Sequence, residues 1–526
     1  MPDFQISPEL CPEPPDVSID PASSSVSELT RAMAEGRLSA TTLIGQCLDR
    51  IKELNPALHA VIAVNPEARA EAAESDEAWE SGSPRGPLEG IPVLVKDNVQ
   101  VAGMPTTAGS PALLGASPPD AFIVSRLRAA GAVVLAKANL SEWANFRSTH
   151  SSSGWSTLGG QTANPYALDR SPSGSSSGSA CGISAGLAPV AIGTETDGSI
   201  VSPSSACGVV GIKPTAGLVS RTGIVPLSPV QDTAGPMARS VADAAATLSV
   251  LAAPDPGDPA ASDLPEHYSQ RPHGFTDYTR FLDKAALDGS RIGVWRAASS
   301  RADATTKAVL DGAVQRLRAL GATVIDSVEL PDVEKITVPE FDALYYEFKY
   351  GINAYLDYLA AWDGGAPGVP GSLAELIKFN EANADQVLCR FGQEIFQAAE
   401  ATTGNLTDPE YLELRGAATR LAVTSLDTPT AEHKLDAIIS LTANPAWLTD
   451  YVLGDHSVFG ASRPAAVSGW PAISVPFGYV SGLPVGVSFV GPPWSEPRLI
   501  ALAYAFEQAT ASRRTPSLLP SVGGRY

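Results

Sequence analysis

Short apolar runs alternate with amphipathic segments along much of this chain, and no other feature constrains its fold as strongly. The run IPVLV at 91–95 ends at Lys96, and a helical pattern over 121–130 is followed by a second apolar run at 132–136. The stretch 291–326 repeats this order with RIGVW, an amphipathic segment and ATVID. Helices that alternate with buried strands predict an α/β fold in which helices are layered on a sheet.

The start of the chain carries two helix signals. Ser25-Val26-Ser27-Glu28 has the pattern of a capping box, which predicts a helix closed by Gly36. A second helical pattern begins near Leu43 and is expected to end at Asn55-Pro56, because proline is unfavourable inside a helix. Residues 1–25 are rich in proline and contain no Lys or Arg, so we expect an extended N-terminal segment without a secretory signal, and a cytoplasmic protein.

The remaining chain, 26–526, is expected to form a single domain. Its core lies at about 85–250, and a mostly helical, aromatic-rich segment at about 330–430 is expected to form a cap beside that core. Strands and a helix over 435–511 complete the same sheet. The run 464–495 has no charged residue, but its prolines exclude one continuous membrane-spanning helix, so buried strands and turns are expected there.

Composition excludes several classes of partner and site. The 57 acidic and 36 basic residues give a net charge of −21, which repels nucleic acids and anionic membranes alike. The five cysteines form no C-x-x-C pair, so neither a disulfide framework nor a cysteine zinc site is indicated. We therefore expect no nucleic-acid partner and no membrane association.

Residues 171–215 are dense in Gly and Ser but also contain apolar runs, which a flexible linker would lack. Within them, 174–178 matches the nucleophile elbow G-x-S-x-G, with Ser176 as the candidate nucleophile of an α/β-hydrolase esterase. An elbow requires an apolar strand before it, whereas the residues before 174 are polar and broken by proline. The base of such an esterase would be one of the histidines that follow, namely His267, His273, His433 and His456.

A serine nucleophile can instead use a neutral lysine as its base. No lysine here follows a serine in the S-x-x-K spacing, so a lysine base must come from elsewhere in the fold. Lys96 ends an apolar run, where burial would lower its pKa, and losing its proton at pH 7 would otherwise cost roughly 4 to 5 kcal/mol. Lys137 and Lys213 also follow apolar runs, and the local patterns do not choose among the three.

Several motifs, in order, resemble the amidase signature family. They are GIPVLVKDN (90–98), GGQTANPY (159–166), SPSGSSSGSA (171–180), GTETDGSI (193–200), GVVGIKPT (208–215) and QDTAGPMARSVADAA (231–245). The resemblance implies a large mixed β-sheet sandwiched between layers of α-helices, with no metal and no organic cofactor. It also implies a Ser-Ser-Lys triad with Ser199 as nucleophile, Ser175 as a bridging serine in a cis peptide and Lys96 as base. The backbone N–H groups of Thr196, Asp197, Gly198 and Ser199 would form the oxyanion hole.

Within that family the chain looks most like the bacterial peptide amidases, through SEWANFRS (141–148), GTETDGSIVSP and GLVSRTGIVP. This likeness implies hydrolysis of a carboxamide C–N bond through an acyl-serine, with release of ammonia from C-terminal peptide amides, by a monomer or homodimer. The alternative is a glutaminase subunit of a tRNA-dependent amidotransferase. Phe146, Arg147 and Thr149 lie in the segment expected to line the pocket.

Two positions depart from the usual family pattern. Ser173-Gly174 and Asp197-Gly198 stand where many members have two glycines. The triad residues are unaffected, but the surroundings of the leaving amine change. For the Asp197 side chain two interpretations remain open, a hydrogen bond to the substrate NH₂ or exposure to solvent.

Overall fold

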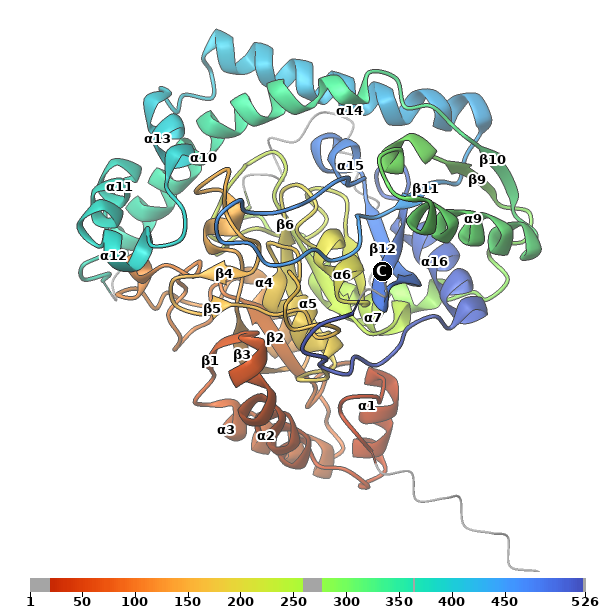
Figure 1. Cartoon of the computed structure of the whole chain (residues 1–526). Helices are drawn as coiled ribbons and strands as arrows, with labels where there is room; N and C mark the ends of the chain where they lie inside the picture. Colours follow the sequence, from red (N-terminus) through yellow and green to blue (C-terminus); the bar gives the residue numbers. More distant parts are fainter. Residues whose placement is uncertain (1–18, 259–276, 363–364, 524–526) are drawn as a thin grey trace, which may run out of the picture.

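The computed structural model describes residues 19–258, 277–362 and 365–523 (Figure 1). Its main element is an eleven-stranded sheet in the order β1-β3-β2-β6-β8-β7-β12-β13-β11-β9-β10. β2 is parallel to β3 and β6, and β9 is parallel to β10 and β11, whereas the other neighbours are antiparallel. The predicted large mixed sheet is therefore confirmed. The strands are β1 (Val61–Val64), β2 (Pro92–Lys96), β3 (Val133–Ala138), β6 (Val190–Glu195), β7 (Val210–Lys213), β8 (Thr233–Ala238), β9 (Arg291–Val294), β10 (Thr323–Asp326), β11 (Ala437–Leu441), β12 (Ala472–Val480) and β13 (Leu483–Val490), with β4 (Trp155–Ser156) and β5 (Gly160–Gln161) forming a separate hairpin.

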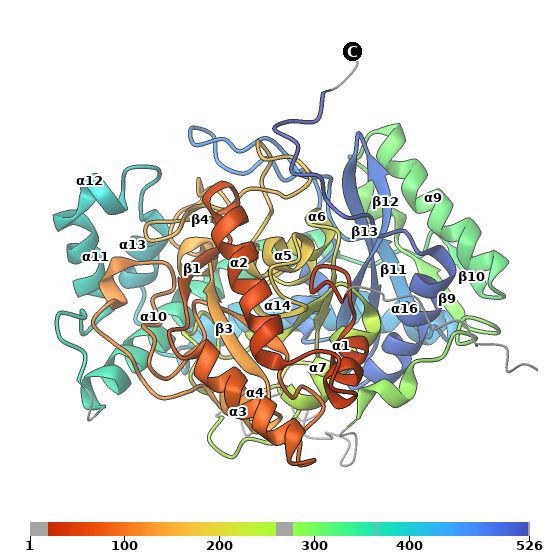
Figure 2. The same ribbon diagram turned by 90° about the horizontal axis from the view of Figure 1, so that it is seen from below.

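Helices flank this sheet, as predicted: α4 packs on β3, α5 on β6, α7 on β8 and α16 on β12. In Figure 1, helices α1–α3 lie at the bottom of the molecule, α10, α13 and α14 lie in its upper part, and α11 and α12 lie at the left; the view from below shows α2 and α3 in front (Figure 2). The helices are α1 (Val26–Ala34), α2 (Ala40–Leu58), α3 (Ala68–Glu80), α4 (Phe122–Ala129), α5 (Ser177–Ser184), α6 (Val201–Ala206), α7 (Val241–Leu251), α9 (Ala304–Ala319), α10 (Thr337–Ala361), α11 (Leu373–Ala382), α12 (Ala384–Val387), α13 (Glu394–Ala401), α14 (Pro409–His433), α15 (Arg463–Ser468) and α16 (Glu496–Thr510).

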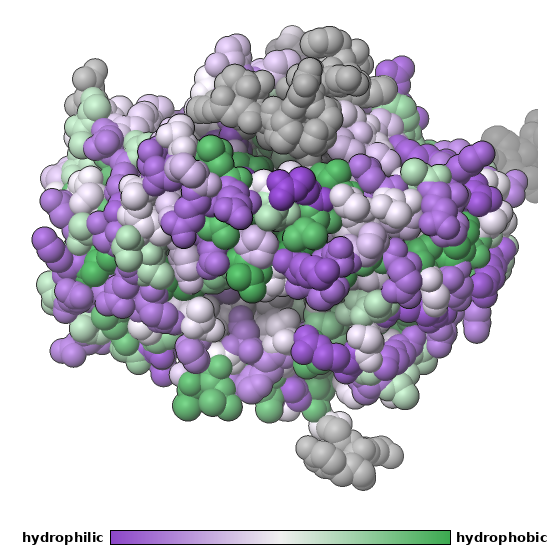
Figure 3. Space-filling model, turned by 90° about the horizontal axis from the view of Figure 1, so that it is seen from above, coloured by the Kyte–Doolittle hydropathy of each residue, from purple (hydrophilic) through white to green (hydrophobic). Residues whose placement is uncertain are grey.

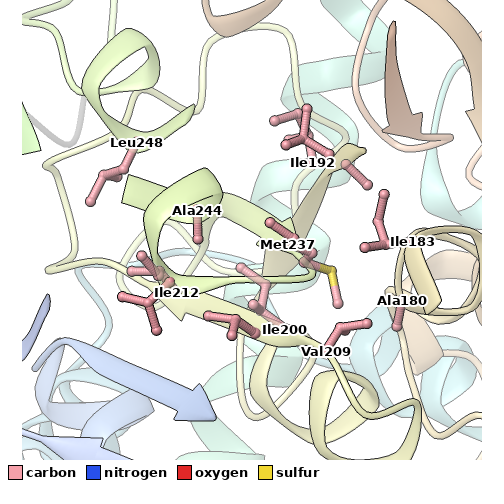
Figure 4. Close-up of a cluster of buried hydrophobic side chains, with 14 of the residues drawn as sticks. Ala180, Ile183, Ile192, Ile200, Val209, Ile212, Met237, Ala244 and Leu248 are labelled. Carbon is pink, nitrogen blue, oxygen red and sulfur yellow. The ribbon is translucent and has the colours of Figure 1, made fainter. Parts of the chain in front are cut away.

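Helix α5 lies at the centre of the fold, and every one of its residues is buried. Its composition explains this position, because a Cβ added at Gly178 would lie 2.2 Å from the backbone oxygen of Ala60. Only glycine permits such a close approach of backbone to backbone. Figure 4 shows Ala180 and Ile183 of α5 beside Met237 of β8 in the central apolar cluster. The glycines and small residues of the Ser/Gly-rich segment thus serve close packing as well as chemistry.

The N-terminal helices confirm one prediction and correct another. The Ser25 hydroxyl accepts from the Glu28 N–H and the Glu28 carboxylate accepts from the Ser25 N–H, which is the predicted capping box. The prediction that the second helix ends at Asn55-Pro56 is wrong, because α2 continues through Pro56 to Leu58. Proline in the last turn removes only one helical hydrogen bond, and the Asn55 side chain is fixed by two hydrogen bonds to the Val61 backbone.

The two later segments have the predicted secondary structure. The uncharged run 464–495 forms most of α15 and the paired strands β12 and β13. In the part of the chain that the structure describes, no helix combines the length and apolarity needed to cross a bilayer. The segment 330–430 contains α10 to α14, and α10, α11 and α13 share one apolar cluster that includes aromatic residues of α10 and α13. From above, the molecule shows hydrophilic residues interspersed with small hydrophobic groups (Figure 3), which fits helices that bury one side only.

Candidate active site

Two serine-bearing segments lie side by side at the centre of the molecule. One is the loop that leads into α5, and the other is the turn 196–199 between β6 and α6 (yellow in Figure 1). The Ser176 N–H donates to the Ser199 backbone oxygen at 3.1 Å, which holds the two segments together. The peptide bond between Gly174 and Ser175 is cis. The segments that carry Ser175 and Ser199, which are 24 positions apart in the sequence, are therefore neighbours in the structure.

Lys96 stands at the end of β2, next to β6, and is fully buried. Its Nζ lies 2.8 Å from Ser175 Oγ and 2.8 Å from Thr194 Oγ1. Burial lowers the pKa of Lys96 to about 7, against the opposing effect of the Asp232 and Glu195 carboxylates. A substantial fraction of Lys96 is thus neutral near pH 7 and in contact with a serine hydroxyl, as a base requires.

The two rival lysines are engaged elsewhere. Lys137 forms an ion pair with Asp97 at 3.2 Å and donates to the Val99 backbone oxygen at 2.7 Å. Lys213 donates to the Pro214 backbone oxygen at 3.1 Å, and burial lowers its pKa to about 8. Within the described ranges, neither amine has a hydrogen bond to a serine hydroxyl. Geometry therefore separates three lysines that the sequence pattern leaves equivalent.

The elbow interpretation finds no support in this arrangement. Ser176 Oγ donates to the Thr194 backbone oxygen at 3.0 Å, and a loop rather than a strand precedes it. His433 is the last residue of α14, and His456 contacts Asp450 in a surface loop. The two other candidate histidines, His267 and His273, lie outside the described residues.

The turn 196–199 has the features that an oxyanion hole requires. Gly198 adopts a left-handed conformation with φ 82°, and among the described residues the N–H groups of the last three turn residues have no acceptor. The buried Glu195 carboxylate accepts from the N–H groups of Ile200 at 2.7 Å and Val201 at 3.0 Å, which fixes the far end of the turn. Fixed and unpartnered N–H groups are able to stabilise a developing negative charge.

Three residues beside Lys96 and the turn, Glu195, Thr194 and Asp232, stand outside the catalytic residues that the sequence predicts. Asp232 accepts from Thr196 Oγ1 at 2.6 Å, so a carboxylate from the residue just before β8 also supports the turn. Burial raises the pKa of both Glu195 and Asp232. The available signal was an acidic residue inside the apolar strand that precedes the turn, because such a residue is rarely buried without a specific partner.

The Asp197 carboxylate is contacted by two side chains of this protein, and the side chain is 21% exposed. Its Oδ1 accepts from Ser462 Oγ at 2.5 Å, and its Oδ2 lies 3.3 Å from Arg463 Nε. Both partners come from the start of α15, more than 260 positions along the chain. The carboxylate is thus held by the protein itself.

The three residues expected to line the pocket have different surroundings. Phe146 is buried and its ring contacts aromatic rings of α10. Arg147 is fully buried, with Nη1 2.8 Å from Glu142, so its guanidinium is already paired. Thr149 is exposed and bound to the Glu394 carboxylate. In the described part of the chain, no group of three or more His, Cys, Asp or Glu side chains is arranged to hold a metal ion.

Comparisons with known proteins identify the family of this chain. The Amidase family model matches residues 42–500. A probable amidase of Arabidopsis thaliana is 41% identical, covering 94% of this chain and 92% of its own length. A glutamyl-tRNA(Gln) amidotransferase subunit of Symbiobacterium thermophilum is 35% identical, covering 95% of this chain and 100% of its own length. The crystal structure of a peptide amidase from Stenotrophomonas maltophilia superposes with a TM-score of 0.88 at 49% identity, covering 94% of this chain and 99% of that one. This chain is an enzyme of the amidase signature family.

Proposed function

We propose that this enzyme hydrolyses linear carboxamides, C-terminal peptide amides in particular, through an acyl-enzyme on Ser199. The observation that carries the proposal is the 2.8 Å contact between the buried Lys96 Nζ and Ser175 Oγ, beside the segment that holds Ser199. The substrate class is supported by the likeness to the S. maltophilia peptide amidase. We further propose that the enzyme acts alone, as a monomer or homodimer.

The proposed reaction has two halves. Ser199 Oγ attacks the amide carbonyl carbon while its proton passes to Ser175 Oγ and the Ser175 proton passes to neutral Lys96. The carbonyl electron pair moves to oxygen, and the N–H groups of the turn 196–199 bind the resulting oxyanion. Collapse breaks the C–N bond, and the proton returns through Ser175 to the nitrogen, which leaves as ammonia. Water then attacks the acyl carbon by the same route and regenerates Ser199.

A substrate panel tests the proposal. We expect an amidated dipeptide or tripeptide to give the highest kcat/KM, measured as ammonia release, with acyl anilides, fatty acid amides and free glutamine well below it. The alternative, a glutaminase subunit, is raised by the 35% identity to the S. thermophilum amidotransferase protein. Activity on glutamine alone, and only after partner subunits are added, would overturn the proposal in favour of that alternative.

The pH profile supplies a second test. Because Lys96 must be neutral to act as base and its pKa is about 7, we expect kcat/KM to rise with pH through an apparent pKa near 7. Burial, together with the neighbouring Asp197 carboxylate, also raises the pKa of Glu340 to about 7. Glu340→Gln therefore serves as the control, since the rise of kcat/KM with pH should keep its apparent pKa in this variant. If kcat/KM no longer rises with pH near 7 in Glu340→Gln, the titrating group is the Glu340 carboxylate instead of Lys96.

A further inference from the structure

The peptide unit between Thr196 and Asp197 is held on its carbonyl side by a buried glutamine. Gln231 Nε2 donates to the Thr196 backbone oxygen at 3.1 Å and to Glu340 Oε1 on α10 at 3.0 Å. Gln231 and Glu340 have exposed fractions of only 1% and 2%. Hydrogen bonds between groups so well shielded from water leave the carbonyl little freedom to rotate.

The same peptide unit is held a second time through the Asp197 side chain. Arg463 Nε lies 2.8 Å from Glu340 Oε2 and 3.3 Å from Asp197 Oδ2, so the guanidinium stands between the two carboxylates. The path from the Thr196 oxygen through Gln231, Glu340 and Arg463 to Asp197 therefore closes into a ring. We name Gln231, Glu340 and Arg463 the peptide clamp.

The clamp is anchored to the upper helices. Arg415 on α14 donates to Gln231 Oε1 at 2.7 Å and pairs with Glu347 on α10 through Nε and Nη2, both at 2.7 Å. Tyr411, one turn earlier on α14, donates to the same Glu347 carboxylate at 2.8 Å. Gln231 thus has its amide oxygen and nitrogen both engaged, which fixes the orientation of its side chain.

From this geometry we propose that the peptide clamp is a set of positioning residues that aims the Asp197 N–H at the substrate oxyanion. The inference rests on the proposed function. In a planar trans peptide the N–H points opposite to the carbonyl, so fixing the Thr196 oxygen on Gln231 directs the Asp197 N–H to the opposite side. That N–H has no acceptor among the described residues, and the turn it belongs to contains Ser199. The Asp197 carboxylate lets the clamp hold this residue through its side chain, which would be impossible with a glycine at the same position.

The test uses two variants and a pair of probes that differ only at the reacting carbon. A peptide aldehyde forms a tetrahedral adduct: Ser199 Oγ bonds to the carbonyl carbon, the C=O π pair moves to the oxygen to give the oxyanion, and the Ser199 proton passes through Ser175 to Lys96. The corresponding peptide alcohol binds without reacting. In Gln231→Leu we expect kcat to fall by about 10- to 100-fold with KM changed less than about threefold, because aligned donors act mainly in the transition state. Affinity for the aldehyde should fall by a similar factor, and affinity for the alcohol should be kept.

Arg463→Ala carries the same test at a site where the side chain is 40% exposed, so it keeps the proposal falsifiable if Gln231→Leu does not fold. Its expected loss is smaller, about three- to tenfold in kcat and in aldehyde affinity, because the hydrogen bond from Gln231 to the Thr196 oxygen remains. Tyr346→Phe is the matched control, since it removes a hydrogen bond between α10 and Glu410 on α14 without contacting the clamp. This control should leave both kcat and the ratio of aldehyde to alcohol affinity unchanged.

The outcomes separate this inference from the proposed function. If the wild type hydrolyses amides through Ser199 but the clamp variants lose aldehyde and alcohol affinity equally, or lose neither, the clamp does not position the oxyanion donor. If Tyr346→Phe changes the ratio as much as Gln231→Leu does, the effect belongs to helix packing in general. Full activity in Ser199→Ala would instead overturn the proposed function itself.

Discussion

Replacing Ser199 with alanine is expected to lower kcat by at least about four orders of magnitude, because removal of a serine nucleophile leaves only binding and oxyanion stabilisation. Ser199 is more accessible to a substrate than the neighbouring serines Ser175 and Ser176. It is 8% exposed, whereas Ser175 and Ser176 are both 0% exposed. Ammonia release from an amidated peptide measures the loss, and mass spectrometry of the wild type after rapid quenching should show an acyl group on the peptide that contains Ser199.

Ser176→Ala is the matched control for this prediction. Ser176 Oγ donates to the Thr194 backbone oxygen and accepts from the Thr194 N–H at 3.2 Å, so its hydroxyl serves the junction between α5 and β6. We expect activity to stay within about tenfold of the wild type and the free energy of unfolding to fall by about 1 to 3 kcal/mol, as for loss of a buried hydrogen bond. The reverse result, an inactive Ser176→Ala and an active Ser199→Ala, would restore the elbow interpretation.

The choice of Lys96 as the proposed base needs more information than the sequence pattern contains. Lys96, Lys137 and Lys213 each follow an apolar run, and all three are buried. The pattern reports burial, but it does not report which strand lies beside which. β2 is next to β6 in the sheet, and this pairing brings Lys96 to Thr194 and to Ser175. The family resemblance points to Lys96 through its sequence motif alone, independently of these contacts.

The supporting residues were harder to predict because they are distant in sequence. Gln231 and Glu340 are 109 positions apart, and Ser462 and Asp197 are 265 positions apart. No local periodicity links such residues, since they meet only when α10 and α15 pack over the turn. Arg147 shows the opposite difficulty: a charged residue inside a family motif suggests a role in substrate binding, but the fold pairs it with Glu142 away from water.

Replacing Lys96 with methionine is expected to lower kcat by several orders of magnitude, and raising the pH should not restore activity. In the proposed mechanism, hydroxide is not needed because Lys96, which contacts Ser175 within the buried site, accepts its proton. Methionine fills a similar volume but has no basic group, so kcat/KM of the variant should no longer rise with pH near 7. Retention of most activity would transfer the role of base to another group, with Lys213 and Lys137 as the first candidates.

The same substitution should make the protein more stable, and the pH dependence of this gain has a defined sign. A lysine pKa of about 7 in the folded state, against 10.5 for the ordinary side chain, means that between these values the unfolded chain holds a proton that the folded chain has released. Burial of Lys96 therefore costs stability at and below pH 7, by roughly 4 to 5 kcal/mol, and the cost declines as the pH rises toward 10.5. Lost hydrogen bonds to Ser175 and Thr194 offset part of the gain, at about 1 kcal/mol each.

We accordingly expect the free energy of unfolding of Lys96→Met to exceed that of the wild type by about 1 to 3 kcal/mol at pH 6, with a smaller excess at pH 9. Urea unfolding at both pH values measures the difference. Ser176→Ala is again a useful comparison, since its effect on stability should not change between the two pH values. A Lys96→Met variant that is less stable than the wild type at both pH values would mean that the lysine is not held near neutrality by burial. Loss of activity and gain of stability in one variant would show that the site keeps a costly buried amine for its chemistry.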